Sequence, residues 1–224
     1  SIEETYENWN GAFGAAKIAP VLIGAAESGN GVHRLLKSLR HDVPENSLTA
    51  ARVGLDKGDG CIAQVLKTYH TASSGKMSLV RIWRGALRDG VSLNGQRVAS
   101  VNRMVGQAIN KVSGSSGGDI VALGRMDGVR TGDILSTNGE ISAPDVLKVE
   151  VLTPIYAFAV KAESRQDEVK LSNALQKLVE EDRSLSFEAD AETHQMLLRG
   201  QGEIHLQIAL ERARSKYSLP LITD

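Results

Sequence analysis

Apolar positions near the N-terminus predict two helices and one buried strand. The first helix is predicted from four residues that share one helical face: Ile2, Tyr6, Trp9 and Phe13. A continuous apolar run over residues 18–23 is typical of a strand in a parallel sheet, and the turn-prone residues 28–31 follow it. The second helix is predicted from the i, i+3, i+4, i+7 spacing of Val32, Leu35, Leu36 and Leu39. Because one parallel strand cannot form a sheet alone, we expect the end of an α/β domain whose other strands lie outside this chain.

Between about Leu55 and Leu135 the pattern changes to short β-prone runs separated by turn signals. The runs cover residues 61–69, 77–83, 91–93, 97–101, 120–123 and 134–135. Asn94-Gly95 is the clearest hairpin signal, because a type I′ turn needs positive φ at both central positions and these residues tolerate it. No long helical pattern interrupts the region. The sequence therefore predicts a closed or nearly closed antiparallel β-barrel.

The polar residues 137–144 read as a linker to a third unit with its own pattern. Strands are predicted at residues 155–160, 185–189, 196–199 and 219–222. One helix is predicted from the apolar stripe Leu171, Ala174, Leu175, Leu178 and Val179, and a second from Leu206, Ala209, Leu210, Ala213 and Tyr217. The resulting order, β-α-β-β-α-β, is that of an α+β, ferredoxin-like domain.

Composition and net charge limit the kinds of partner that this protein can bind. The apolar share of 42% supports packed cores, and 26 basic against 27 acidic residues leave a formal charge of -1. A near-neutral chain has no overall attraction to nucleic acid or anionic membranes, so any RNA contact must come from a local patch. The chain has one cysteine, Cys61, and no apolar run long enough to span a membrane. We expect a cytoplasmic protein that does not bind membranes.

The sequence contains few candidates for catalysis, and we predict no catalytic residue and no metal site. A phosphate-binding GxxxxGK[ST] loop is missing, since Gly75-Lys76 is followed by Met77. Glu203 and His205 stand two apart at a predicted helix start, so they point in different directions and are not expected to act as an acid–base pair. The other histidines lack the i, i+4 spacing of a zinc helix.

Five cations cluster in the first predicted hairpin and at its exit: Lys67, Lys76, Arg81, Arg84 and Arg88. Such a cluster is able to contact the phosphates of RNA. A solvated strand face explains the same pattern equally well. Aromatic residues make up only 4% of the chain, so base stacking is not expected to contribute much.

Three stretches resemble elongation factor G and its relatives among the translational GTPases, in the expected order. The first, residues 20–32, resembles the guanine-contacting loop that ends a GTPase strand. The second resembles the barrel that follows and includes Gly75-Lys-Met-Ser-Leu-Val-Arg-Ile-Trp-Arg-Gly85 and Thr131-Gly-Asp-Ile-Leu135. The third resembles the next domain and includes residues 171–182 with Gly200-Gln-Gly-Glu-Ile-His-Leu206. Departures from the family pattern occur at Ala25, Gln201 and Gln207 and in the loop 70–74.

The resemblance implies three parts: residues 1–45 as the end of a P-loop GTPase domain, 46–140 as the barrel, and 145–224 as the ferredoxin-like domain. It implies that Gly24, Ala25 and Ala26 contact guanine in the intact parent. The parent is expected to bind GTP and Mg²⁺ and to hydrolyse GTP during protein synthesis. This fragment is expected to hold no cofactor and to be inactive. Its implied partners are the ribosome, through ribosomal RNA and proteins, and its own missing GTPase domain.

Two alternatives remain open at this point. Release factor 3, the ribosomal protection proteins and the BipA-type GTPases share the same domain order. A standalone RNA-binding or ribosome-associated adaptor is able to use the same two folds without a GTPase domain.

Overall fold

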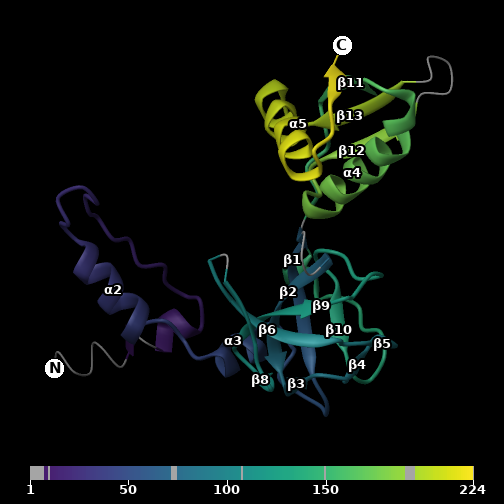
Figure 1. The fold of residues 1–224 in the computed structure, drawn as a ribbon. Coiled ribbons are helices and arrows are strands. Elements are labelled where there is room, and N and C mark those ends of the chain that lie inside the picture. The colour runs from purple at the N-terminus through teal and green to yellow at the C-terminus, as the bar shows by residue number, and fades with distance from the viewer. Residues whose placement is uncertain are drawn as a thin grey trace.

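The structure is a computed structural model, and it describes residues 8–9, 11–71, 75–106, 108–148, 150–189 and 195–223. Within these residues an N-terminal segment with helices precedes a six-stranded sheet flanked by two small sheets (Figure 1). A four-stranded sheet with two helices follows. We call the part around the six-stranded sheet the barrel unit and the part after residue 150 domain III.

The barrel unit is antiparallel throughout, as predicted. Its large sheet has the order β10-β1-β2-β9-β6-β7, and its longest strands are the neighbours β1 (Ile62–Thr71) and β2 (Gly75–Arg84). The other strands are β6 (Ser100–Val105), β7 (Ala108–Lys111), β9 (Ile120–Gly124) and β10 (Ile134–Ser136). The small sheets pair β3 (Ala86–Arg88) with β8 (Gly114–Ser116), and β4 (Ser92–Leu93) with β5 (Gln96–Arg97). One apolar cluster fills this unit, including Val65, Val80, Ile82 and Leu123.

The hairpin at Asn94-Gly95 is confirmed. Both residues have positive φ, 46° and 77°, and they connect β4 to β5. The Asn94 side chain also donates to the carbonyl of Ile134 at 2.8 Å and accepts from the amide of Ser136 at 2.9 Å. The turn residue therefore ties a small sheet to the edge strand β10.

Closure of the barrel is not shown. The outer strands of the large sheet are β10 and β7, and no pairing joins them in the part of the chain that the structure describes. A closed barrel requires a hydrogen-bonded register between its first and last strands. Asn94 bonds to β10 instead, through its side chain and through its backbone amide, which donates to the carbonyl of Ser136 at 2.9 Å.

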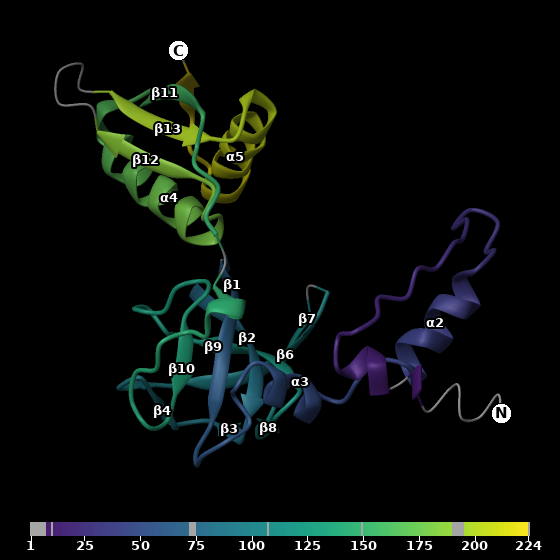
Figure 2. The ribbon, with the colours of Figure 1, turned by 180° about the vertical axis from the view of Figure 1, so that it is seen from behind.

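Domain III has the predicted order of elements. Its sheet runs β12-β13-β11-β14, with β11 (Tyr156–Ala162), β12 (Ser186–Ala189), β13 (Met196–Gly200) and β14 (Leu221–Thr223), all antiparallel. The helices α4 (Glu168–Glu181) and α5 (Glu203–Tyr217) lie on one face of it (Figure 2). A short 3-10 turn, η2 (Arg165–Asp167), precedes α4, and the Ser164 hydroxyl caps this turn rather than α4. The predicted apolar stripes of the two helices meet Val160 and Leu198 in one core.

The N-terminal segment departs from the prediction. The apolar run 18–23 forms no strand, and Val21 and Ile23 are 86% and 92% exposed. A parallel strand needs a hydrogen-bonding neighbour, and the described residues offer none here. The helix α2 (Val32–His41) forms as predicted and lies apart from both sheets (Figures 1 and 2). The side chains of its stripe are exposed: Leu35 by 43%, Leu36 by 55% and Leu39 by 56%.

The next helix and the linker belong to the barrel unit. Helix α3 (Asn46–Arg52) packs through Ala50 onto an apolar cluster with Trp83. The linker after β10 contains a 3-10 turn, η1 (Asp145–Leu147), whose Leu147 packs on that cluster and accepts a hydrogen bond from Gln64 at 3.3 Å. The predicted linker, residues 137–144, is also fastened to the barrel unit: Thr137 Oγ1 accepts from the amide of Cys61 at 3.0 Å, and Ala143 packs on the same cluster.

Replacing Leu198 by Ala should destabilise domain III by about 2–5 kcal/mol, because this side chain is fully buried between Phe158 and Phe187. Urea unfolding followed by circular dichroism measures the change. The matched control is Val169→Ala on the exposed face of α4, which should change stability by less than about 0.5 kcal/mol. Equal effects of the two substitutions would contradict this core assignment.

Candidate functional site

The five cations predicted as one patch lie apart in the structure. Lys76 is buried: its ammonium donates to the carbonyl of Asp127 at 2.7 Å and lies 3.1 Å from Oε2 of Glu180 in α4. Lys67 is half-buried beside α5, where it lines a cavity with Tyr69. Both cations therefore face domain III rather than open solvent.

The two arginines on β2 support the barrel. The Arg81 guanidinium lies 4.1 Å from the ring centroid of Trp83 and donates to Oδ1 of Asn46 in α3 at 3.2 Å. Arg84 donates to the carbonyls of Asp59 and Gly60 at 3.0 and 3.4 Å. These contacts hold α3 and the loop before β1 against the sheet.

Arg88 differs from the other four cations because it is exposed. A phosphate-binding role of the five residues stays a prediction. The structure does not bring them together, and three of them already have polar partners within the protein: Lys76, Arg81 and Arg84.

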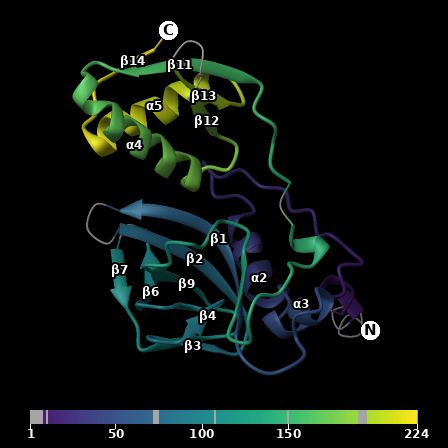
Figure 3. The same ribbon diagram turned by 90° about the vertical axis from the view of Figure 1, so that its right-hand side faces the viewer.

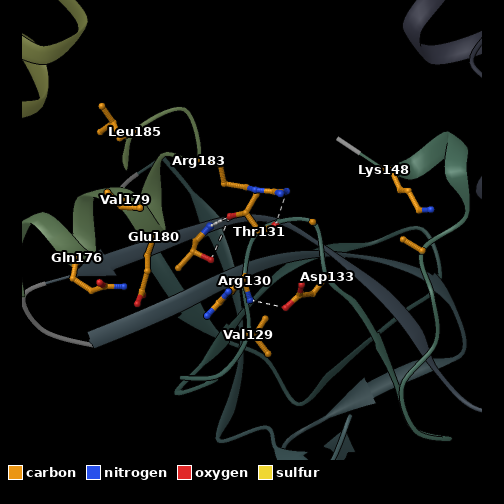
Figure 4. Close-up of a pocket in the computed structure, with 13 residues that line it drawn as sticks. Val129, Arg130, Thr131, Asp133, Lys148, Gln176, Val179, Glu180, Arg183 and Leu185 are labelled. Carbon is orange, nitrogen blue, oxygen red and sulfur yellow. Dashed lines mark hydrogen bonds between the residues drawn. The ribbon is translucent and has the colours of Figure 1, made fainter. Parts of the chain in front are cut away.

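A cleft of about 720 Å³ lies between the barrel unit and domain III. Arg130, Thr131 and Asp133 line it from the barrel side, and Glu180 and Arg183 line it from domain III (Figure 4). Its two walls touch where Nη1 of Arg183 donates to the carbonyl of Thr131 at 3.1 Å. Both positively and negatively charged side chains line the cleft, so it has no strong preference for a cation or an anion.

One wall of the cleft is built around Glu180, near the end of α4. Its Oε2 lies 2.9 Å from Nε2 of His70 and 3.1 Å from Nζ of Lys76. Burial alone would raise the pKa of Glu180, but the hydrogen bonds from His70 and Lys76 and the charge of Lys76 outweigh it and lower the pKa below its usual value. The carboxylate therefore stays ionised at neutral pH.

We did not predict Glu180 as a site residue, although the sequence carries a signal for it. Residues 180–182 are three acids at the C-terminal end of a helix, where the helix dipole disfavours negative charge. Such a run indicates cations supplied from elsewhere. The structure supplies one from β2, since Lys76 pairs with Glu180 from more than 100 residues earlier in the chain.

A second polar cluster joins α4 to α5 within domain III. His205 Nδ1 accepts from the amide of Gln201 at 3.1 Å, so Nε2 carries the proton toward Oδ2 of Asp182, 3.3 Å away. The hydroxyl of Ser184 donates to the other oxygen of Asp182 at 2.6 Å. Because serine and histidine bind the same carboxylate and not each other, this is not the arrangement of a nucleophilic triad. Glu203 instead accepts from the side chain of Gln207 at 2.9 Å.

The predicted guanine loop, Gly24 to Ala26, is an exposed tight turn. The amide of Ala25 donates to the carbonyl of Asn30 at 2.9 Å, which closes the turn. A side chain at Gly24 would come within 2.7 Å of the same carbonyl, which explains the glycine. A guanine contact at these residues stays a prediction.

Other reactive groups point to structural roles. Burial raises the pKa of the Cys61 thiol to about 11, which disfavours the reactive thiolate. In the described part of the chain, no group of three or more His, Cys, Asp or Glu side chains is arranged to hold a metal. No helix among those residues is long and apolar enough to cross a membrane.

Comparison with known proteins matches both units. Residues 151–224 match the family model "Elongation Factor G, domain III". An elongation factor G-like protein of Synechocystis is 48% identical over 213 residues, which is 94% of this chain and 31% of that relative. The chain is thus a relative of elongation factor G. The resemblance predicted from its motifs is confirmed.

Two further relatives support the assignment. Elongation factor G of Orientia tsutsugamushi is 30% identical and covers 89% of the chain and 31% of that protein. A crystal structure of a Thermus thermophilus protein is 28% identical, with a TM-score of 0.73 over 87% of this chain and 29% of that chain. The chain therefore spans about a third of the length of the relatives of the elongation factor G type.

Replacing Asp182 by Asn should destabilise domain III by about 1–2 kcal/mol at pH 7, since the carboxylate accepts from Ser184 and His205. Burial raises the pKa of Asp182, but these hydrogen bonds outweigh it and lower the pKa below 3.8. The stabilisation is then present above the unfolded pKa and is lost as the pH falls through the folded one. Urea titrations at pH 7 and at about pH 3 should show the difference between wild type and variant shrinking in acid.

The matched control is Asp56→Asn, in the exposed loop before β1, which should change stability by less than about 0.5 kcal/mol at either pH. A loss of stability in Asp182→Asn that is the same at both pH values would contradict the assigned role of the carboxylate.

Proposed function

We propose that this chain is the ribosome-binding middle part of a translational GTPase of the elongation factor G type, acting in the cytoplasm in protein synthesis. The observation that carries the proposal is the alignment with elongation factor G-like proteins over 94% of the chain, through both the barrel unit and domain III. Fold alone would not assign this role, because barrels and β-α-β-β-α-β domains serve many functions. The names of the relatives favour elongation factor G over the other factors with this domain order.

We propose further that residues 1–45 complete a GTPase domain whose other strands and phosphate loop precede them in the parent protein. The exposed stripe of α2 and the unpaired apolar run 18–23 support this. Burial of such a run against a sheet contributes about 25 cal/mol per Å² of apolar surface. The sheet of the parent would supply both the hydrogen-bonding neighbour for that run and the cover for Leu35, Leu36 and Leu39.

This chain alone should not bind GTP at micromolar concentrations. The phosphate loop and its magnesium-binding Ser or Thr are missing from the sequence, and the amide of Ala25 is already bonded to Asn30. Two backbone contacts to guanine would contribute roughly 2 kcal/mol, against about 8 kcal/mol for micromolar affinity. Isothermal titration with GTP and Mg²⁺ should show no saturable signal, and phosphate release should match the buffer blank. A micromolar isotherm would require a nucleotide site elsewhere in the chain.

Binding of this chain to ribosomes should weaken as salt rises from about 50 to about 200 mM, because a near-neutral chain must rely on local contacts to phosphate. Co-sedimentation with purified ribosomes measures it. Charge reversal at Arg88 and at Arg97, which is also exposed and lies beside Gly90, should reduce the bound fraction. Reversal at Arg81 or Arg84 is a poorer test, because both residues support the barrel.

The matched control is Arg165→Glu, which reverses an exposed charge on domain III. An equal loss in this variant would indicate a general charge effect rather than a barrel interface. Binding to free RNA but not to ribosomes would favour the adaptor alternative. If binding responds neither to salt nor to charge reversal, Arg88 and Arg97 do not bind phosphate.

A further inference from the structure

The junction between the barrel unit and domain III contains no shared apolar core. The buried apolar residues of the described chain form three clusters, from which only Met77 and Ala122 of the barrel unit are left out. One cluster lies inside the barrel unit, one inside domain III, and one between α3, the barrel and the linker. None of them combines residues of the barrel with residues of domain III. Polar contacts therefore carry the junction, and polar interfaces between domains permit relative motion unless something fixes them.

The polar contacts converge on the end of α4. Oε2 of Glu180 binds both His70 Nε2 and Lys76 Nζ, at 2.9 and 3.1 Å. Its neighbour Glu181 accepts from the backbone amide of His70 at 2.6 Å and from Nζ of Lys216 in α5 at 2.5 Å. The hairpin of β1 and β2 runs beneath α4 and carries His70 and Lys76 to this place (Figure 3).

Because Lys76 is buried, the junction depends strongly on the carboxylate that pairs with it. Its side chain is only 7% exposed, and its other bond is to a neutral backbone carbonyl, that of Asp127. Glu180 is the carboxylate within ion-pair distance of Lys76 in the described structure. Glu180 itself is half-buried, but its removal would leave the buried charge of Lys76 uncompensated, whereas a fully exposed pair contributes little. Glu180 is thus the residue whose charge matters most at the junction.

We propose that Glu180, with His70 and Lys76, forms a charge clasp that sets the orientation of domain III relative to the barrel unit. One carboxylate holds two groups of the opposite unit, so its neutralisation releases both links together. Two links then remain in the described structure: the backbone amide of His70 still donates to Glu181, and Arg183 still donates to the carbonyl of Thr131. Neither pairs two opposite charges, so both tether the units without fixing their angle. Because Glu180 also lines the cleft of about 720 Å³, release of the clasp opens that cleft.

Distance measurements between paired spin labels test the clasp directly. Suitable positions are Ser113→Cys on the barrel unit and Asn173→Cys on α4, both exposed, while the native Cys61 is buried and is expected to label poorly. Wild type in low salt should give one narrow distance distribution. Glu180→Gln should broaden this distribution about twofold or shift its mean. Lys76→Met should have the same effect, because it replaces the buried charge by an apolar side chain of similar length.

The matched control is Glu188→Gln, which should leave the distance distribution unchanged. It removes an ion pair within the sheet of domain III, in which Oε1 of Glu188 lies 2.6 Å from Nη2 of Arg199. The charge exchange K76E/E180K should narrow the distribution again, and wild type should broaden as salt rises to about 500 mM. Circular dichroism confirms that each variant is folded. Unchanged distributions in both Glu180→Gln and Lys76→Met, or equal broadening in Glu188→Gln, would overturn the proposal.

Discussion

The antiparallel pairing of β1 with β2 is the interaction on which the rest of the structure depends. These two ten-residue strands are neighbours inside the large sheet and contribute Val65, Val80 and Ile82 to the barrel core. The register shifts between Val65 and Lys67, and such a bulge bends a strand and increases its twist. The same hairpin extends beyond the core and ends against α4. A single supersecondary element therefore both stabilises the barrel unit and contacts domain III.

The length of β2 also explains why the predicted basic patch does not form. Strands rise about 3.4 Å per residue, so Lys76 and Arg84 at its two ends lie roughly 27 Å apart. Arg81 lies between them and, by the alternation along the strand, on the opposite face from Lys76, against Trp83 and α3. Three cations that are close in sequence therefore reach three different environments. Each environment gives its cation a structural partner.

The charges at the junction have partners within the described structure, whereas the apolar side chains near the N-terminus are left uncovered. Lys76 and Glu180 are mutually satisfied, and their pairing links two units that share no apolar core. Residues 18–23 and the stripe of α2 are apolar and exposed, so the described structure does not satisfy them. Alignment with relatives about three times as long is consistent with a larger protein in which this surface is covered, as we propose.

The sequence by itself determined the local elements and the family. Helices α4 and α5, the order of the domain III elements and the turn at Asn94-Gly95 were predictable, because apolar periodicity and turn chemistry are properties of each segment. The motifs at residues 75–85 and 200–206 carried the resemblance for the same reason. Only the tertiary structure decided whether residues 18–23 pair as a strand, whether the sheet closes, and where each cation points. These outcomes depend on partners distant in the chain: His70 and Glu180 are separated by 110 residues, and no local pattern specifies that they meet.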